Sequence, residues 1–303
     1  MKVVFIVGAT ASGKSDWALR WAQKHQGVVV NCDSVQVYRE VEIGTAKPTL
    51  QESSSCPHYL FDYVSPPEEM TAGNYYRDFY KLLPTLQAPV AFVVGGTGFY
   101  FQAIEKGLYP VLTVPPEIKL KLEQDFKSLG GEVLWQELKQ VDPETASELH
   151  PNDSYRVMRA LEVWRAFQKP MSAFKKEFAA QAAPFAWPLL KVGPLWEREE
   201  LRQRISLRTQ QMLTKGLLAE VADLKKRGLE SWAPLASVGY KECLQVLEKS
   251  LAEEELEGAI SLATSQLAKR QMTWFKRDPQ VQWFAGSTGF AEASKSVEVF
   301  LNQ

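Results

Sequence analysis

The stretch KVVFIVGATASGKS, residues 2–15, joins a short apolar run to a glycine-rich loop that ends in Lys14 and Ser15. The run is continuous rather than alternating, which is the pattern of a strand covered on both faces. The loop has the spacing Gly-x-x-x-x-Gly-Lys-Ser, in which glycines let successive backbone N–H groups point at phosphate oxygens. A helix that begins after such a loop adds partial positive charge at its N-terminus. We therefore expect a buried strand, then a phosphate-binding loop at residues 8–15, then a helix.

Two further apolar runs, residues 28–30 and 90–94, have the same continuous character. Between them, the apolar residues from 75 to 86 follow one helical stripe, which predicts the crossover helix that a parallel connection needs. Residues 188–192 and 281–284 are candidates for later strands. The fold class that these runs predict is α/β: a P-loop NTPase-like parallel sheet flanked by helices.

Residues 114–190 show helical periodicity alone, and we expect them to form an all-helical insertion domain. Residues 1–113 and 191–303 would then be the two parts of one P-loop core, and residues 179–184 would be a flexible hinge. Helix starts and breaks are expected at Gly130, Asp142, Asp153 and Pro170.

The charge of the chain limits how it could bind nucleic acid. Its 303 residues are 45% hydrophobic and 23% charged, which is ordinary for a globular protein, and the formal net charge is −1. A uniformly basic surface is therefore excluded, and any RNA contact must come from local clusters. Such clusters lie in two amphipathic segments near residues 197–227 and 253–276. A solvated helix face is the alternative explanation for each.

Other sequence features indicate no membrane segment and no metal framework. The N-terminal apolar run is too short for a signal peptide or a membrane span, so we expect a cytoplasmic protein. The three cysteines are an odd number without Cys-x-x-Cys spacing, so neither a disulfide framework nor a zinc site is indicated. No exposed heptad pattern is present, and we expect a monomer.

A carboxylate follows the second apolar run rather than the third. P-loop ATPases and GTPases hold magnesium with an acidic residue that ends the third strand, but here Gly95-Gly96-Thr97-Gly98 stands at that place. Asp33 follows the second run, and the carboxyl ends of strands in an open parallel sheet face the ligand crevice. We expect Asp33 beside the phosphate loop as a candidate general base. A helix N-cap is the alternative.

Further motifs follow in a fixed order along the chain. They are Asp33-Ser34-x-Gln36-x-Tyr38, Gly44-Thr45-Ala46-Lys47-Pro48, Gly95-Gly96-Thr97-Gly98-x-Tyr100, His150-Pro151-Asn152-Asp153 with Arg156 and Arg159, Val238-Gly239-Tyr240-Lys241-Glu242, and Gln266-Leu267-Ala268-Lys269-Arg270-Gln271-x-Thr273-Trp274-Phe275. With the phosphate loop, their number, order and spacing resemble the tRNA dimethylallyltransferases, also called tRNA isopentenyltransferases. The resemblance spans about residues 3–285.

The resemblance implies transfer of a dimethylallyl group from dimethylallyl diphosphate to the N6 amine of the adenosine on the 3′ side of the anticodon in tRNA. Diphosphate would be released, and the partners would be the prenyl diphosphate and a tRNA anticodon stem-loop. The implied cofactor is Mg²⁺, bound at Ser15; the loop would by its motif also suit ATP, but the reaction would not need it. The diphosphate would be held by Gly8, Ala9, Thr10, Ala11, Ser12, Gly13, Lys14 and Ser15, through the backbone N–H groups from Ala9 onward and the Thr10 hydroxyl.

The resemblance also implies roles for single side chains. Asp33 would accept the N6 proton, Thr97 would lie near the reacting centre, and Arg204 would face the diphosphate from opposite the loop. Arg208, one helical turn onward, is a second candidate. A surface ion pair with Glu199 or Glu200 is the alternative for either arginine.

Recognition of the adenine is expected from Ser34 and from Gln36, whose amide offers both a donor and an acceptor. Tyr38 or Phe99 could stack on a base, with core packing as the alternative. The contacts with tRNA that the resemblance implies are Asp33, Ser34, Val35, Gln36, Thr97, Lys119, Tyr155, Arg156, Val157, Met158, Arg159, Tyr240, Lys241, Lys269 and Arg270.

Three other functions are compatible with parts of this pattern. A small-molecule kinase would share the loop, but the missing carboxylate after the third run weighs against it. A prenyltransferase that acts on free adenine nucleotide would share the site, but it would not need the two basic segments. A non-catalytic RNA-binding module would not need Asp33, Lys14 and Arg204 together.

Overall fold

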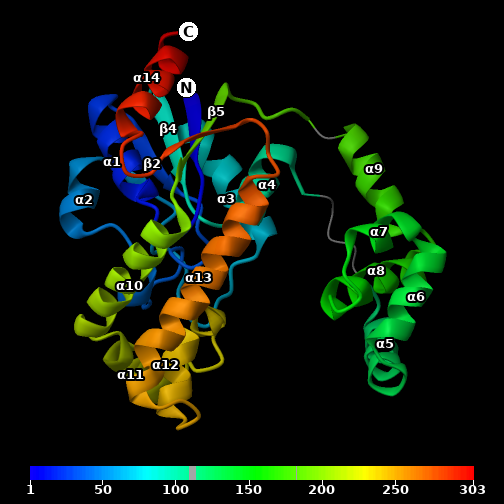
Figure 1. Cartoon of the computed structure of the whole chain (residues 1–303). Coiled ribbons are helices and arrows are strands. Elements are labelled where there is room, and N and C mark those ends of the chain that lie inside the picture. Colours follow the sequence, from blue (N-terminus) through cyan, green and yellow to red (C-terminus); the bar gives the residue numbers. More distant parts are fainter. Residues whose placement is uncertain (109–113, 182) are drawn as a thin grey trace. The chain divides into compact units, whose positions relative to one another are not determined.

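The computed structural model describes residues 1–108, 114–181 and 183–303, and these form two compact units (Figure 1). The larger unit comprises Met1–Glu105 and Phe185–Gln303, and the smaller comprises Lys106–Pro184. We had expected the insertion at residues 114–190, and the boundary at residue 113 lies outside the described residues. So does residue 182, in the expected hinge.

The larger unit is built on a six-stranded sheet in the order β3-β2-β4-β1-β5-β6, in which all neighbouring strands are parallel. Its strands are β1 (Lys2–Ile6), β2 (Val28–Asn31), β3 (His58–Tyr59), β4 (Val90–Val94), β5 (Leu189–Leu195) and β6 (Val281–Ala285). The predicted parallel sheet and its five predicted strands are confirmed. The two-residue strand β3 was not predicted.

Successive residues of the strands enter two separate apolar cores. Val3 and Phe5 of β1 pack in one core, whereas Val4 and Ile6 pack in the other. Helices α1 (Lys14–Lys24) and α14 (Phe290–Asn302) contribute to the second core, and α3 (Ala72–Leu82) and α4 (Gly98–Lys106) contribute to the first (Figure 1). Because both faces are covered, the strands need apolar residues at every position, and this explains the continuous runs in the sequence.

A third core lies among α10 (Arg198–Thr214), α11 (Leu217–Lys226), α12 (Tyr240–Leu247) and α13 (Leu256–Phe275). The larger unit also contains helix α2 (Leu50–Ser55), which has no buried residue, and short 3₁₀ turns at Ile43–Thr45, Leu83–Thr85, Ala233–Ala236 and Glu253–Glu255. The segment 197–227 is two helices rather than one, because Gly216 has a φ of 94° that interrupts it. Tyr38, Trp232 and Tyr240 are buried in this third core.

The smaller unit is all-helical and has its own apolar core. It contains α5 (Pro116–Leu129), α6 (Gly131–Val141), α7 (Pro143–Glu148), α8 (Ser154–Phe167) and α9 (Met171–Gln181). Asp142 and Asp153 cap α7 and α8, as the sequence predicts. The buried Asp142 carboxylate also accepts a hydrogen bond from the Ser172 amide at 3.0 Å, which ties α9 to α7. Among the described residues, no helix is long and apolar enough to cross a membrane.

The ends of β2 and β4 approach so closely that there is no room for a side chain at Gly95. A Cβ atom on Gly95 would lie 1.9 Å from the carbonyl oxygen of Cys32, so Gly95→Ala must displace backbone. We expect this variant to lose about 1–3 kcal/mol of unfolding free energy, measured by urea denaturation.

Gly258→Ala is the matched control, because Gly258 lies in α13 with open space around it. It should gain about 0.5–1 kcal/mol from helix propensity. Equal denaturation midpoints for the two variants would contradict the predicted clash.

Candidate active site

Three loops leave the sheet at the same edge. The phosphate loop follows β1, Asp33 follows β2 and the turn Gly95-Gly96-Thr97-Gly98 follows β4. In the sheet β4 lies between β2 and β1, and Val94 pairs in register with Ile6 on one side and Asn31 on the other. Because the strands are parallel, their carboxyl ends bring the three loops together.

The phosphate loop holds a buried lysine and the uncapped start of a helix. Gly13 is the N-cap residue of α1, with a φ of 87°, and no described side chain hydrogen-bonds to the start of this helix. Lys14 is only 8% exposed and its ammonium donates to the carbonyl of Ala9 at 2.5 Å. The buried Ser12 hydroxyl has no hydrogen-bond partner in the described part of the chain. Trp196, which follows β5, stabilises the loop, because its Nε1–H donates to the Ser12 carbonyl at 2.8 Å.

Gln271 on α13 connects the phosphate loop to the glycine turn. Its Oε1 accepts a hydrogen bond from the backbone amide of Thr10 at 2.8 Å, and its Nε2 donates to the carbonyl of Gly96 at 3.0 Å. The Thr10 amide is therefore already engaged, whereas we had expected it to point at the diphosphate. Although Gln271 stands in one of the motifs, its role was not predicted, because no local pattern indicates that α13 packs against this edge.

Two arginines of α10 reach the phosphate loop. Arg204 is exposed; its Nε donates to the carbonyl of Ala11 at 2.8 Å, and its guanidinium stacks on the ring of Trp196 at 4.3 Å. Arg208 donates from Nη1 to the hydroxyl of Thr10 at 3.2 Å. The ion pair with Glu199 that was the alternative explanation for these arginines is made instead by Arg202, at 3.6 Å. Both candidate arginines thus lie at the loop.

The charges at this edge depend on one another. Burial lowers the pKa of Lys14 to about 8; Asp33 opposes that shift and Arg208 adds to it. Burial also lowers the pKa of Arg208, and Asp33 partly offsets this effect. Lys14 and Arg208 therefore share one carboxylate, and a bound anion would stabilise their charged forms.

The Asp33 carboxylate closes a local turn instead of capping a helix. Its Oδ1 accepts from the amide of Val35 at 2.9 Å, and no helix begins there. The second oxygen, Oδ2, would be 3.6 Å from a Cβ atom on Gly96, so it faces the glycine turn. Thr97 lies beside it: its hydroxyl accepts from the Ser34 amide at 2.9 Å and donates to the Ser34 hydroxyl at 3.2 Å.

The Gln36 amide is less available than expected. Its Nε2 donates to the carbonyls of Thr45 at 2.9 Å and Ala46 at 3.2 Å, so the donor is used within the protein and Oε1 is left as an acceptor. Tyr38 is 4% exposed and packs edge-on against Trp232, which is the core alternative. Phe99, in contrast, is 46% exposed.

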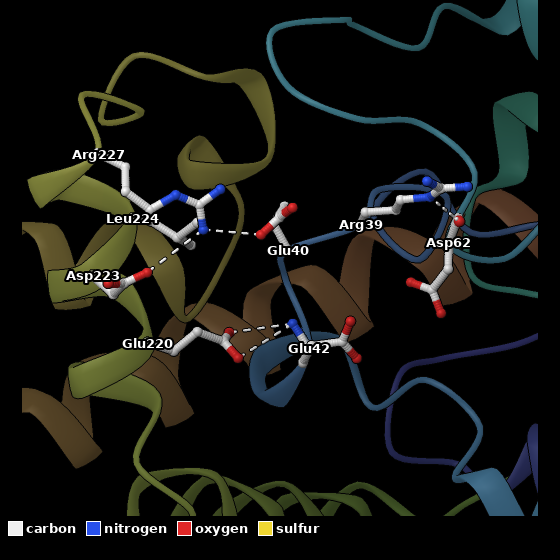
Figure 2. A pocket seen from close by; sticks show the side chains of 8 residues that line it. All are labelled: Arg39, Glu40, Glu42, Asp62, Glu220, Asp223, Leu224 and Arg227. Atoms are coloured by element: carbon white, nitrogen blue, oxygen red, sulfur yellow. Dashed lines mark hydrogen bonds and ion pairs between the residues drawn. The ribbon is translucent and has the colours of Figure 1, made fainter.

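Tyr240 is buried and hydrogen-bonds to the loop that contains Gly44. It is fully buried; its hydroxyl donates to Glu220 Oε1 at 2.6 Å and accepts from the Gly44 amide at 3.1 Å. Glu220 also accepts from the amides of Glu42, at 3.3 Å, and Ile43, at 3.0 Å, and Figure 2 shows it reaching the backbone of Glu42. The expected contact of the Tyr240 side chain with RNA is not available in this structure.

The same region contains an open hollow of about 550 Å³ (Figure 2). It is lined by Arg39, Glu40, Glu42, Asp62, Glu220, Asp223, Leu224 and Arg227. Its charges are largely paired with one another, since Arg227 bonds Glu40 at 2.9 Å and lies 3.5 Å from Asp223. The hollow is thus lined by side chains that hold loops together, and no predicted site residue lies in it.

Most other expected RNA contacts are exposed, within their own unit. In the larger unit these are Lys241, Lys269 and Arg270; in the smaller unit they are Lys119, Tyr155 and Arg156. Val35, Met158 and Arg159 are half-buried, and Arg159 pairs with Glu162 at 2.7 Å. Val157 is 1% exposed, so its side chain belongs to the core of the helical unit.

Lys14 gives a prediction about pH. Only the charged ammonium attracts an anion, so the affinity for inorganic diphosphate should fall as pH rises above 8, by up to about tenfold per pH unit. Titration calorimetry across that range would measure this. In Lys14→Arg the charge persists, and the fall should disappear. A wild-type affinity that does not change above pH 8 would disprove the assignment of Lys14 to the anion.

Known proteins share this fold and most of this sequence. A family model described as IPP transferase matches residues 36–278. A tRNA dimethylallyltransferase of Bdellovibrio bacteriovorus is 52% identical over 302 residues, covering 99% of this chain and 98% of its own. A tRNA dimethylallyltransferase of Nostoc sp. is 41% identical over 283 residues, or 93% of each chain.

Solved structures agree. The full-length tRNA isopentenylpyrophosphate transferase of Bacillus halodurans superposes with a TM-score of 0.73 and 30% identity, over 99% of this chain and 97% of its own. A eukaryotic dimethylallyltransferase acting on tRNA gives a TM-score of 0.82 at 26% identity, over 100% of this chain and 80% of its own. On the family match and these identities, the chain belongs to the IPP transferase family.

Proposed function

We propose that this member of the IPP transferase family transfers a dimethylallyl group from dimethylallyl diphosphate to the N6 amine of the adenosine on the 3′ side of the anticodon in tRNA. The observation that carries the proposal is the meeting of a phosphate loop, Asp33 and Thr97 at the ends of β1, β2 and β4. Relatives named tRNA dimethylallyltransferase, up to 52% identical, support it.

The diphosphate of the prenyl donor lies in the phosphate loop. The start of α1 supplies uncapped backbone N–H groups and the positive end of a helix dipole, and Lys14 supplies a full charge. The Ser12 hydroxyl, buried without a partner in the described residues, is a further group that a phosphate oxygen would satisfy. The Thr10 amide is the exception, because Gln271 already holds it.

Magnesium fits this site as a companion of the substrate. Ser15 is exposed on the first turn of α1, and its hydroxyl is an oxygen ligand of the kind that Mg²⁺ prefers. Among the described residues, no group of three or more His, Cys, Asp or Glu side chains could hold a metal ion. The ion would thus rely on diphosphate oxygens, and it would neutralise part of their charge.

The transfer forms one bond and breaks one. The N6 nitrogen of adenine attacks the allylic carbon, the bond from that carbon to the diphosphate oxygen breaks, and the electron pair leaves with diphosphate. Asp33 accepts the N6 proton through Oδ2, while its Oδ1 stays bonded to the Val35 amide. Thr97, whose hydroxyl is fixed by Ser34, would help to position the amine.

Stabilisation of the departing diphosphate is the larger electrostatic task. Lys14, Arg204 and Arg208 supply positive charge from two elements, the loop and α10. The guanidinium groups are already oriented by bonds to loop atoms, so little reorganisation is needed as charge develops. We propose that Arg208 shares the role that the sequence suggests for Arg204.

The adenosine must leave its stack to reach this crevice, and exposed side chains are available to hold the RNA. Lys269 and Arg270 stand on α13, and Tyr155 and Arg156 on α8 of the helical unit. We propose that the helical unit is a tRNA-binding domain. We also propose that the protein is a monomer and acts in the cytoplasm.

The decisive experiment offers the purified protein radiolabelled dimethylallyl diphosphate and Mg²⁺ with unmodified tRNA in one tube and AMP in another. We expect label in tRNA alone. Label in AMP would instead indicate a prenyltransferase that acts on free nucleotide. Label in neither acceptor would contradict the proposed transfer and would favour a kinase.

The role of Asp33 can be separated from binding. Asp33→Asn keeps the volume and the possible bond to the Val35 amide but cannot accept a proton, so we expect transfer to fall by roughly 10²–10⁴-fold. Affinity for tRNA, measured by filter binding, should change little. Near-normal turnover in Asp33→Asn would remove this residue from the mechanism.

A further inference from the structure

The side chain of Gln271 joins the two loops that the reaction needs, and it does so from a third element. Its acceptor holds the Thr10 amide in the phosphate loop and its donor holds the Gly96 carbonyl, one residue before Thr97. Both bonds have ordinary lengths, 2.8 and 3.0 Å, so the amide bridges the ends of β1 and β4.

The glycine turn is shaped to receive this helix. A Cβ atom on Gly96 would lie 2.2 Å from Gln271 Nε2, and one on Gly98 would lie 2.2 Å from the ring of Trp274. Glycine at both positions therefore permits the close approach of α13, and Gln271 reaches the backbone because nothing stands between them.

Apolar contacts other than Gln271 hold α13 in place. Ala268 and Met272, on the same helix, pack with Ala9 of the phosphate loop and Ile205 of α10 in a small apolar cluster. Phe275 is buried in one of the main cores. Since these apolar contacts anchor α13, loss of one half-buried amide should leave the helix where it is.

We propose that Gln271 is a positioning residue, which sets the phosphate loop and the Gly96–Thr97 turn at the spacing that transfer requires. It touches neither proposed substrate; it acts through Thr10 on the diphosphate and through Gly96 on the reacting amine. This inference rests on the proposed function, because spacing between the two loops matters only if prenyl donor and acceptor meet there.

The first test replaces Gln271 by methionine, which keeps the length and removes both hydrogen bonds. We expect kcat for tRNA prenylation to fall by roughly ten- to hundredfold, because misplacement of reacting groups by about 1 Å has effects of this size. The KM for dimethylallyl diphosphate should rise, while affinity for tRNA and the melting temperature should stay at wild-type values.

Gln210→Met is the matched control. Gln210, on α10, also bonds a side chain of another helix, Glu257 at 2.9 Å, but it is exposed and touches neither loop. Its variant should behave as the wild type. Wild-type kinetics in Gln271→Met, or a loss of activity that only follows a lower melting temperature, would overturn the proposal.

A double-mutant cycle with Thr97→Ala tests the route. If Gln271 acts through the turn, the loss in the double variant should be at least about fivefold smaller than the product of the two single losses. Losses that multiply would mean that Gln271 does not act through Thr97.

Calorimetry with inorganic diphosphate keeps the two proposals apart. If the wild-type protein transferred no label, the proposed function would fail. Weaker diphosphate binding by Gln271→Met than by wild type would still support a role of Gln271 in positioning the phosphate loop. Equal binding by the two proteins would refute that role.

Discussion

The parallel register of β2, β4 and β1 is the constraint on which the site depends. Val94 pairs with Ile6 on one side and with Asn31 on the other, so the three strands end at the same level. Each chain segment that leaves them must therefore start at a common edge, whatever its distance in sequence. The approach is so close that a side chain at Gly95 would overlap the Cys32 carbonyl. Helices α10 and α13 then bring Arg204, Arg208 and Gln271 to the same edge.

The charges at that edge of the sheet favour a bound anion. Burial disfavours the ammonium of Lys14, and the guanidinium of Arg208 disfavours it further, so its pKa is low for a lysine. Asp33 counteracts this, but it is one carboxylate facing two cations, Lys14 and Arg208. A diphosphate would supply the missing negative charge and leave Asp33 free to take a proton.

Local sequence patterns predicted those features of the fold that depend on neighbouring residues alone. Continuous apolar runs marked the buried strands, the glycine spacing marked the phosphate loop, and Asp142 and Asp153 marked two helix starts. Contacts between distant segments were not predictable in this way. Gln271 lies far from Thr10 in the chain, and only the path of α13 across the edge of the sheet brings the two together. Strand β3 is two residues long and has no pattern to read. The engagement of the Gln36 Nε2 group was also not predictable, because it donates to the carbonyls of Thr45 and Ala46, which lie in a loop with no regular sequence pattern.

Membership in a motif does not distinguish a residue that contacts substrate from one that holds such a residue. Tyr240 stands in a motif, yet it is buried, and it bonds Glu220 and the Gly44 amide. Burial and the hydrogen bond with Glu220 raise its pKa well above the usual value for tyrosine, so its hydroxyl keeps its proton and remains a donor. The loop that this bond supports includes the carbonyls that fix the amide of Gln36. The buried core therefore fixes the direction of the half-buried Gln36 side chain, which we propose as a contact to the adenine, and binding would cost little further ordering of that side chain.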